Sequence, residues 1–321
     1  MSENPSDSQA PESQPRETQP QETRSQETRS QETQPTNPQP ERAPPPAAGF
    51  APARPLSFTL IVPTVYGQML VNRNDINQTN ALFKTGQAID HPEIELLATI
   101  LSLAPPDPIV ADVGANIGTY TLRLAAVAGP RGRVHCFEPQ RILCNMIAGS
   151  TVLNGLTNVI CHTMAVGARE GALEVPQFDY HRPLNFGSIE FGPEQREPLD
   201  QPRGHDPLLR EFVPVTTLDR FGFTRLDLMK IDAEGMEDDV LTGATETIKR
   251  CRPVLYVEFQ KSDYVALKTR LQGLGYTLYP VQMNFLGVPA ELSQRFWGAA
   301  RLTETSGCGK FHCNWRFRND V

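Results

Sequence analysis

The sequence predicts an α/β fold with a doubly wound, mostly parallel sheet, preceded by a disordered N-terminal tail. Three observations lead to this prediction. An apolar run, Ile109–Val113, ends in a glycine-marked turn that opens a helical pattern. A second short apolar run, Arg133–Phe137, follows that helix and ends in Glu138. Strand and helix patterns then alternate along the chain, as they do in parallel sheets built from βαβ units.

The first 55 residues are expected to form the disordered tail. They are nearly all Gln, Glu, Thr, Ser, Pro, Arg and Ala, with the near-repeats QETRS, QETRS and QETQP between residues 21 and 35. A segment with so few apolar side chains cannot offset the entropy lost on ordering. Residues 56–321 are then expected to form one α/β domain, which is a reasonable size for a single core.

Apolar periodicity assigns the elements of this domain. Residues 63–87 are mixed and are interpreted as short strands or a lid over a ligand. In chain order, we expect a helix over 92–103, a strand over 109–113, a helix over 118–127, a strand over 133–137, a helix over 142–153, a strand over 158–166, a strand over 227–231, a helix over 237–251, a strand over 254–259 and a helix over 264–274.

The turn after the first strand has the features of a cofactor site. Gly114 and Gly118 let the backbone turn tightly and let a ligand come close. The helix that follows offers free N–H groups and a positive dipole end. Glu138 ends the second strand, where nucleoside-binding α/β folds hold ribose hydroxyls. We therefore expect a nucleoside-like cofactor rather than glycines that only shape a turn.

Spacing separates two such cofactors. A dinucleotide fold carries G-x-G-x-x-G, but the third and sixth positions here are Asn116 and Thr119. An acid, Asp112, stands two residues before the first glycine. A carboxylate there would repel a pyrophosphate, whereas it suits the ammonium and sulfonium of S-adenosylmethionine. The residues favour S-adenosylmethionine, and a nucleotide-dependent oxidoreductase is the alternative.

Four segments together resemble the FkbM family of S-adenosylmethionine-dependent methyltransferases. They are DVGANIG at 112–118, FEP at 137–139, MKIDAEGME at 229–237 and VEF at 257–259. The resemblance covers roughly residues 80–319. It implies a class I methyltransferase (Rossmann-like) fold with an antiparallel C-terminal edge, formed by 276–279 with 311–317. It also implies S-adenosyl-L-methionine as cofactor and, most often, methylation of a hydroxyl oxygen. The stretch 276–289 looks shortened, so the resemblance says less about the substrate than about the cofactor.

The expected cofactor-binding residues lie at the carboxyl ends of the first, second and fourth parallel strands. They are Asp112, Gly114, Asn116, Gly118, Glu138 and Asp232. Their position matches the edge of an α/β sheet at which ligands bind.

Three carboxylates are the candidates for catalysis. Methyl transfer to an alcohol needs alignment with the C–S bond and a base that takes the hydroxyl proton. Asp232 and Glu234 follow a predicted strand, and Glu258 ends the next one, so all three are expected at the same edge. The sequence does not divide among them the roles of holding the cofactor, orienting the substrate and acting as base. Lys230 is expected to face away from Asp232 or to pair locally.

Other acids and the long loop carry weaker predictions. Asp238 and Asp239 are interpreted as acids that complement the dipole of a first helical turn, and the same interpretation is open for Glu237. Residues 178–212 form a loop long enough to be functional. Within it, Asn185 and Gly187 belong to N-F-G-S, which resembles a family loop near the methyl-transfer centre; a plain turn is the alternative. His181 and His205 are secondary base candidates.

Bulk properties bound the remaining function classes. A formal net charge of −7 argues against broad nucleic-acid binding. No apolar run reaches the length of a membrane span, and the first residues lack a signal-peptide pattern, so we expect a cytoplasmic enzyme. We expect no metal, because the Cys308–His312–Cys313 group lacks a second ligand pair. A small molecule or glycan is the expected substrate, and a non-catalytic S-adenosylmethionine-binding scaffold is a further alternative.

Overall fold

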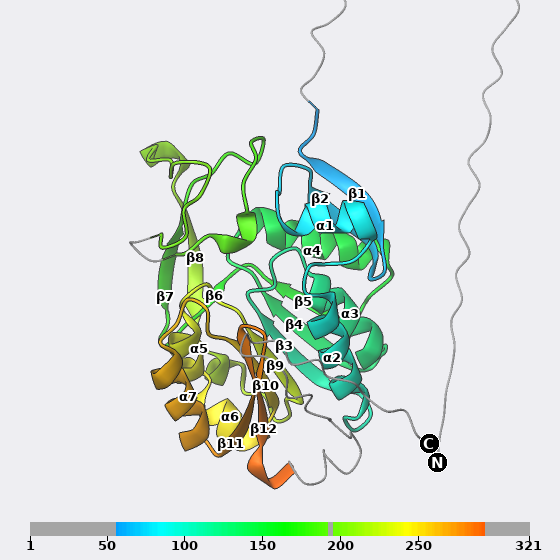
Figure 1. Ribbon diagram of the computed structural model, residues 1–321, viewed down its shortest axis with the longest axis vertical. Helices are drawn as coiled ribbons and strands as arrows, with labels where there is room; N and C mark the ends of the chain where they lie inside the picture. The colour runs from blue at the N-terminus through cyan, green and yellow to red at the C-terminus, as the bar shows by residue number, and fades with distance from the viewer. Residues whose placement is uncertain (1–55, 192–194, 293–321) are drawn as a thin grey trace, which may run out of the picture. The chain divides into compact units, whose positions relative to one another are not determined.

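The computed structural model describes residues 56–191 and 195–292; the expected tail, residues 1–55, and the segment 311–317 lie outside these ranges. A seven-stranded sheet forms the centre (Figure 1). In spatial order it contains β11 (Tyr276–Val281), β12 (Asn284–Pro289), β10 (Val254–Glu258), β9 (Leu228–Ile231), β3 (Ile109–Val113), β4 (Arg133–Phe137) and β5 (Val159–His162). The five strands from β10 to β5 are parallel, and β12 pairs antiparallel with both β10 and β11. This is the class I methyltransferase fold, and the predicted fold class is confirmed.

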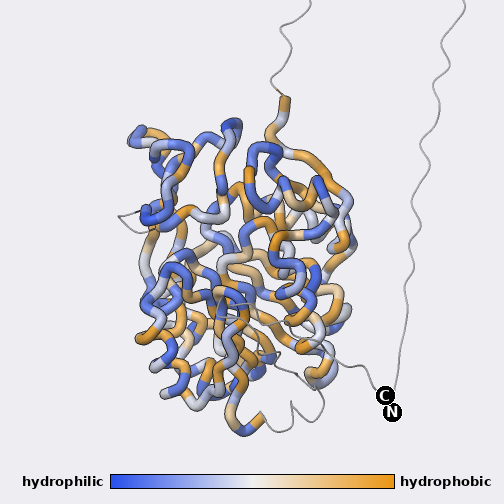
Figure 2. The backbone as a smooth tube through the Cα atoms, in the orientation of Figure 1, coloured by the Kyte–Doolittle hydropathy of each residue, from blue (hydrophilic) through white to orange (hydrophobic). Residues whose placement is uncertain are grey.

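Helices cover both faces of the sheet. They are α2 (His91–Ser102), α3 (Thr119–Ala128), α4 (Arg141–Leu153), α5 (Glu237–Gly243), α6 (Thr245–Cys251) and α7 (Tyr264–Gly273). Side chains from α2 and α3 pack with Val110 and Tyr256 on one face, and those from α5 to α7 pack with Ala111 and Leu255 on the other. Neighbouring strand residues thus enter opposite layers, as the two-residue period of a strand requires. In Figure 2 hydrophobic segments run through these layers, and many loop tips are hydrophilic.

The expected helix over 237–251 is in fact two helices, and this prediction was wrong. The chain breaks at Ala244, between α5 and α6. The Asp219 carboxylate accepts hydrogen bonds from the backbone N–H groups of Glu246 (3.1 Å) and Thr247 (2.6 Å). These amides are the first orphan donors of a new helix, so a side chain from another segment caps α6. Periodicity within 237–251 does not contain that information.

The antiparallel edge contains a strand that was not expected. Within the described residues the strand beside β11 is β12, which begins three residues after β11 ends; the expected partner 311–317 lies outside these residues. Gln282 and Met283 form a two-residue connection, with Gln282 at a φ of 52°. Two-residue hairpins favour positive φ at the turn, because this geometry matches the twist of the strands.

Smaller elements surround the central sheet. The expected short strands in 63–87 are a hairpin, β1 (Thr59–Thr64) and β2 (Gly67–Asn72), followed by helix α1 (Gln78–Thr85). The expected strand 158–166 divides into β5 and β6 (Ala165–Val166). A three-stranded sheet of order β6-β8-β7 was not anticipated; β7 is Gly171–Val175 and β8 is Glu211–Thr216. It holds both ends of the long loop. Across the described ranges, every helix is too short or too polar to cross a bilayer.

Candidate active site

A pocket opens where the central parallel strands end. Its walls come from the turns after β3, β4 and β9 and from the long loop. Among its lining residues are Gly114, Asn116, Glu138, Gln140, Gly187, Ile189, Asp232 and Glu234. A pocket at this edge of a doubly wound sheet is the expected location for a ligand. Six of these eight residues were singled out from the sequence.

The turn after β3 is held by close backbone packing. Gly114 has a φ of +74°, and a Cβ atom there would stand 1.7 Å from the carbonyl oxygen of Asp232. Only glycine therefore allows the turns after β3 and β9 to meet. The backbone N–H groups of Gly114 and Ala115 both donate to the Phe137 carbonyl, at 3.0 and 3.1 Å. Gly118 precedes α3 at a φ of +87° and lies outside the pocket lining.

Glu138 is a buried acid with a preorganised carboxylate. One oxygen accepts from the backbone N–H of Asn116 (2.9 Å), and the other accepts from that of Gln140 (2.8 Å). Burial raises the pKa of Glu138 to about 7, although these hydrogen bonds and Lys230 oppose the rise. Because a carboxylate oxygen can accept more than one hydrogen bond, both oxygens still have capacity for a ligand diol.

Asp112 lies beneath the pocket and does not line it. Its side chain is fully buried; Oδ2 accepts from the Thr121 hydroxyl at 2.6 Å, and Oδ1 lies 3.6 Å from the Lys230 ammonium. Asp112 can therefore contribute to cofactor binding only through the residues that it contacts, Thr121 and Lys230.

Lys230 pairs locally with Asp232, which is one of the two arrangements that the sequence left open. Its ammonium donates to the Gly114 carbonyl at 2.8 Å and lies 3.3 Å from Asp232 Oδ2. It also stands 5.1 Å from the centre of the Tyr120 ring, within range of a cation–π contact. The ammonium of Lys230 thus joins Asp112, below the pocket, to Asp232 at its wall.

The three catalytic candidates lie at one edge, as the sequence predicts for strand-end acids. Burial, followed by repulsion from Asp232, raises the pKa of Glu234 to about 8 and that of Glu258 to about 9. Glu234 lines the pocket, and Glu258 does not. Within the described part of the chain, Asp232 Oδ1 and Glu258 Oε2 are buried without a hydrogen-bond partner. Such atoms are costly to bury unpaired, so Asp232, which lines the pocket, favours a ligand that donates a hydrogen bond.

Glu237 has a role that sequence reasoning missed. Its side chain is fully buried. Oε1 accepts from the backbone N–H groups of Ala233 (2.9 Å) and Gly235 (3.1 Å), and Oε2 accepts from the Ser262 hydroxyl. Glu237 therefore shapes the turn that presents Asp232 and Glu234. Asp238 and Asp239, by contrast, are exposed, as a first-turn role implies.

The long loop reaches the pocket through Gly187. A Cβ atom on Gly187 would stand 2.5 Å from the Asn116 side-chain nitrogen. The Gln140 side chain donates to the Phe186 carbonyl at 2.8 Å, and the Asn185 amide donates to the Ser188 hydroxyl at 2.6 Å. Asn185 itself does not line the pocket, so its contribution is to the shape of the loop.

Three further observations complete the site. His181 and His205 are exposed and lie outside the pocket lining. The Lys261 side chain is 7% exposed and is ion-paired with Glu234, a contact that no sequence pattern indicates. No group of three or more potential metal-ligating side chains occurs within residues 56–191 and 195–292; the Cys308–His312–Cys313 group lies outside those ranges.

Comparison with known proteins gives the family. The family model of the methyltransferase FkbM domain matches residues 112–278, more than half of the chain. The chain belongs to the FkbM methyltransferase family. The matched region contains the turn after β3, Glu138 and the Asp232–Glu237 turn, so the FkbM domain includes the whole pocket edge formed by the sheet.

Individual relatives are distant. Methyltransferase 1 of Beauveria bassiana is 27% identical over 185 residues, covering 54% of this chain and 74% of its own. Methyltransferase sdnD of Sordaria araneosa is 27% identical, covering 44% and 62%. The 2-O-methyltransferase NoeI of Sinorhizobium fredii is 25% identical, covering 50% and 67%. A solved structure of methyltransferase FkbM from Methylobacillus flagellatus is 19% identical with a TM-score of 0.39, covering 55% of this chain and 40% of its own.

Proposed function

We propose that the protein is an S-adenosylmethionine-dependent O-methyltransferase acting on a hydroxyl of a sugar, glycan or natural product. The observation that carries the proposal is the placement of Glu138 and Asp232 on either side of Gly114 in one pocket. That arrangement offers a diol acceptor, a close backbone approach and a negatively charged wall, which are the demands of this cofactor.

Each part of the pocket has a chemical assignment in this proposal. Glu138 accepts hydrogen bonds from the ribose hydroxyls, because both its oxygens are fixed by backbone N–H donors. Gly114 lets the turns after β3 and β9 meet at the pocket, and Gly187 lets the long loop approach Asn116. Asp232 and Glu234 face the cationic end of the cofactor, where their charge is favourable. S-adenosylmethionine supplies an electrophilic methyl group on its sulfonium.

The acceptor hydroxyl must lose a proton as the new bond forms. We assign the base to Glu234, because it lines the pocket and its pKa of about 8 lies near the pH at which a base works best. Asp232 adds an unpaired buried oxygen at the pocket wall, which accepts a hydrogen bond from a further hydroxyl of a polyhydroxylated acceptor. The name of NoeI, a 2-O-methyltransferase, supports oxygen as the accepting atom.

Two measurements test the proposal. Calorimetry with S-adenosylhomocysteine should show binding, and radiolabelled S-adenosylmethionine should transfer label to a member of a panel of glycans and polyhydroxylated natural products. Glu234→Gln should lower turnover by about 10²–10⁴-fold with little change in S-adenosylhomocysteine affinity at neutral pH, whereas Asp232→Asn should weaken binding first. Binding of NADH without binding of S-adenosylhomocysteine would favour the oxidoreductase alternative. Binding without transfer to any acceptor would favour the scaffold alternative.

A further inference from the structure

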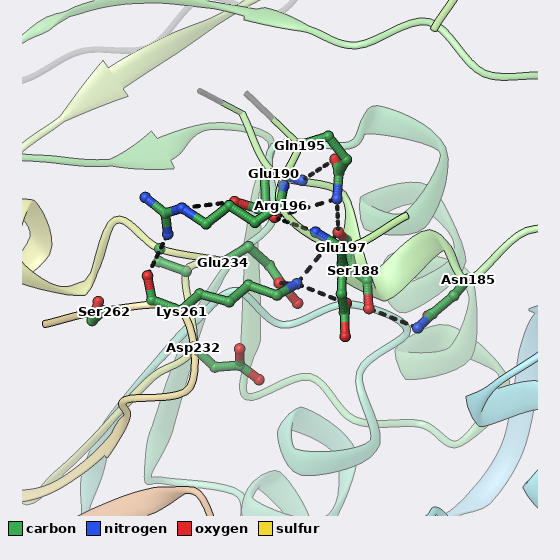
Figure 3. Close-up of polar contacts among 12 residues, drawn as sticks. Asn185, Ser188, Glu190, Gln195, Arg196, Glu197, Asp232, Glu234, Lys261 and Ser262 are labelled. Atoms are coloured by element: carbon green, nitrogen blue, oxygen red, sulfur yellow. Dashed lines mark hydrogen bonds and ion pairs between the residues drawn. The ribbon is translucent and has the colours of Figure 1, made fainter. Parts of the chain in front are cut away.

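Lys261 lies just after β10 and is nearly enclosed by oxygen atoms. Its side chain is 7% exposed. The ammonium forms an ion pair with Glu234 Oε2, lies 3.1 Å from Glu197 Oε2 and donates to the Ser188 carbonyl at 3.4 Å. Figure 3 shows the lysine chain extended between the Glu234 carboxylate and the long loop.

These contacts join two walls of the pocket. Glu234 lines the pocket from the turn after β9, and Ser188 stands between Gly187 and Ile189, which line it from the long loop. One ammonium group therefore contacts a pocket-lining side chain on one wall and the backbone of the other.

The main chain of Lys261 reinforces the connection. The Arg196 guanidinium donates to the Lys261 carbonyl, and the Arg196 backbone N–H donates to Glu190 at 2.8 Å. Gly235 lies close to the Arg196 side chain, since a Cβ atom on Gly235 would stand 2.9 Å from the guanidinium. Both the side chain and the carbonyl of Lys261 thus bind the long loop (Figure 3).

A buried lysine is a costly way to gain stability. Desolvation of two charges commonly cancels their attraction, so apolar residues serve as well where only packing is needed. Burial opposes the charge of Lys261, but its pairs with Glu234 and Glu197 outweigh burial and raise the pKa of the ammonium. The ammonium therefore stays charged beside Glu234.

We propose that Lys261 is a positioning residue that fixes the Glu234 carboxylate at the acceptor side of the pocket and joins the two pocket walls. It acts through Glu234 and touches no ligand itself. This inference rests on the proposed function, in which Glu234 is the base. It adds the group that orients that base and sets its proton affinity.

The charges around Glu234 determine the expected pH behaviour. The charged groups that face it, directly or through Lys261, are Asp232, Glu237, Glu258, Lys261, Glu197 and Arg196. Burial and the neighbouring acids raise the pKa of Glu234, and Lys261 is the cation that opposes them. Removing the ammonium should therefore raise that pKa further, and the carboxylate would ionise only at a higher pH.

The test uses sinefungin, a stable analogue of S-adenosylmethionine that carries an amine in place of the sulfonium methyl. Its affinity is measured by calorimetry at intervals from about pH 6 to about pH 10. For the native protein, affinity should rise as Glu234 ionises, with a midpoint near pH 8. Lys261→Met should shift the midpoint upward by about one pH unit or more. Glu234→Gln should remove the dependence with that midpoint. A purely structural lysine would change the folded fraction and leave the midpoint in place.

The control is Lys249→Met, which removes an exposed lysine whose ammonium pairs with Glu246 at 2.9 Å. It should leave both affinity and midpoint unchanged. An unchanged midpoint in Lys261→Met overturns the inference. If that variant does not fold, retention of the native pH dependence in Glu234→Gln overturns it equally. Failure of the native protein to bind sinefungin and S-adenosylhomocysteine at any pH overturns the proposed function as well, which separates the two failures.

Discussion

Gly114 and Asp232 approach so closely that a Cβ atom on Gly114 would force apart the carboxyl ends of β3 and β9. The distance from a Cβ on Gly114 to the Asp232 carbonyl oxygen would be 1.7 Å. Since backbone rather than a flexible side chain stands in the way, the two turns cannot adapt separately. This contact therefore fixes how the turns after β3 and β9 meet at the pocket.

Substituting Gly114 tests that contact. Gly114→Ala should abolish S-adenosylhomocysteine binding and destabilise the domain by clearly more than the cost of positive φ alone, which is about 1 kcal/mol. Gly86→Ala is the matched control, because Gly86 has a φ of +71° and no atom within 4 Å of the place that a Cβ would take. Calorimetry and urea denaturation measure the two effects. Equal losses in both variants would show that strain, and not the close approach, determines the result.

Replacing Glu138 tests the diol acceptor. Glu138→Gln should weaken S-adenosylhomocysteine binding about tenfold or more, because a charge-assisted acceptor is lost and an NH₂ group would face a backbone N–H. Calorimetry gives the affinity. Glu174→Gln serves as the control, since that acid forms an exposed pair with Arg210 away from the pocket lining. Native affinity in Glu138→Gln would rule out the ribose assignment.

The raised pKa of Glu258 has a consequence for stability. Its folded-state pKa of about 9 lies above its ordinary value of 4.5, so the folded protein binds this proton more tightly than the unfolded chain does. Stability from this group is fully present below about pH 4.5 and is lost as the pH rises through about 9. Glu258→Gln mimics the protonated form. The difference in unfolding free energy, variant minus native, should therefore increase between about pH 5 and about pH 9.

Urea denaturation at several pH values checks this slope. Asp239→Asn is a suitable control, because Asp239 is an exposed acid. The change with pH in this control should be smaller than the change in Glu258→Gln. A flat difference for Glu258→Gln would mean that Glu258 is ionised in the folded protein at neutral pH.

The cap on α6 gives a prediction about stability alone. Asp219→Ala removes the acceptor for two backbone N–H groups and should cost about 0.5–2 kcal/mol of unfolding free energy. Affinity for S-adenosylhomocysteine should not change, because Asp219 is not among the pocket-lining residues. Asp263→Ala provides a comparison: Asp263 caps α7 through Val265 and Ala266, and a similar cost is expected. No loss in either variant would show that water satisfies these amides equally well.

Sequence reasoning succeeded where the determining information is local. The apolar run of β3, the turn glycines and Glu138 follow one another along the chain, and their positions follow from strand and turn geometry. Asp232 and Glu258 were placed at one edge because the carboxyl ends of parallel strands meet there. The structure bears out that shared location.

What the sequence did not predict depends on contacts between distant segments. The start of α6 depends on Asp219, which accepts a hydrogen bond from the N–H of Glu246 although it lies 27 residues before it in the chain. Lys261 gains its surroundings from the turn after β9 and from the long loop, neither of which is its sequence neighbour. In the sequence, Glu237 has the position of an ordinary acid in a first helical turn. Only the structure shows that the preceding turn donates two backbone N–H groups to its carboxylate. Pattern and propensity do not encode such approaches.

The Lys230 ammonium is shared between two carboxylates, those of Asp112 and Asp232, at 3.6 and 3.3 Å. Counted together, these three side chains leave one negative charge without a partner beside the pocket. In the proposed reaction the donor enters as a sulfonium and leaves as a neutral thioether. The positive charge beside Asp232 is therefore lost on methyl transfer. The proton of the acceptor hydroxyl goes to Glu234, so the total charge of the site is conserved while the charge beside Asp232 is not. Such a site would discriminate between the spent and the fresh donor by charge alone, and so favour exchange of one for the other after each turnover.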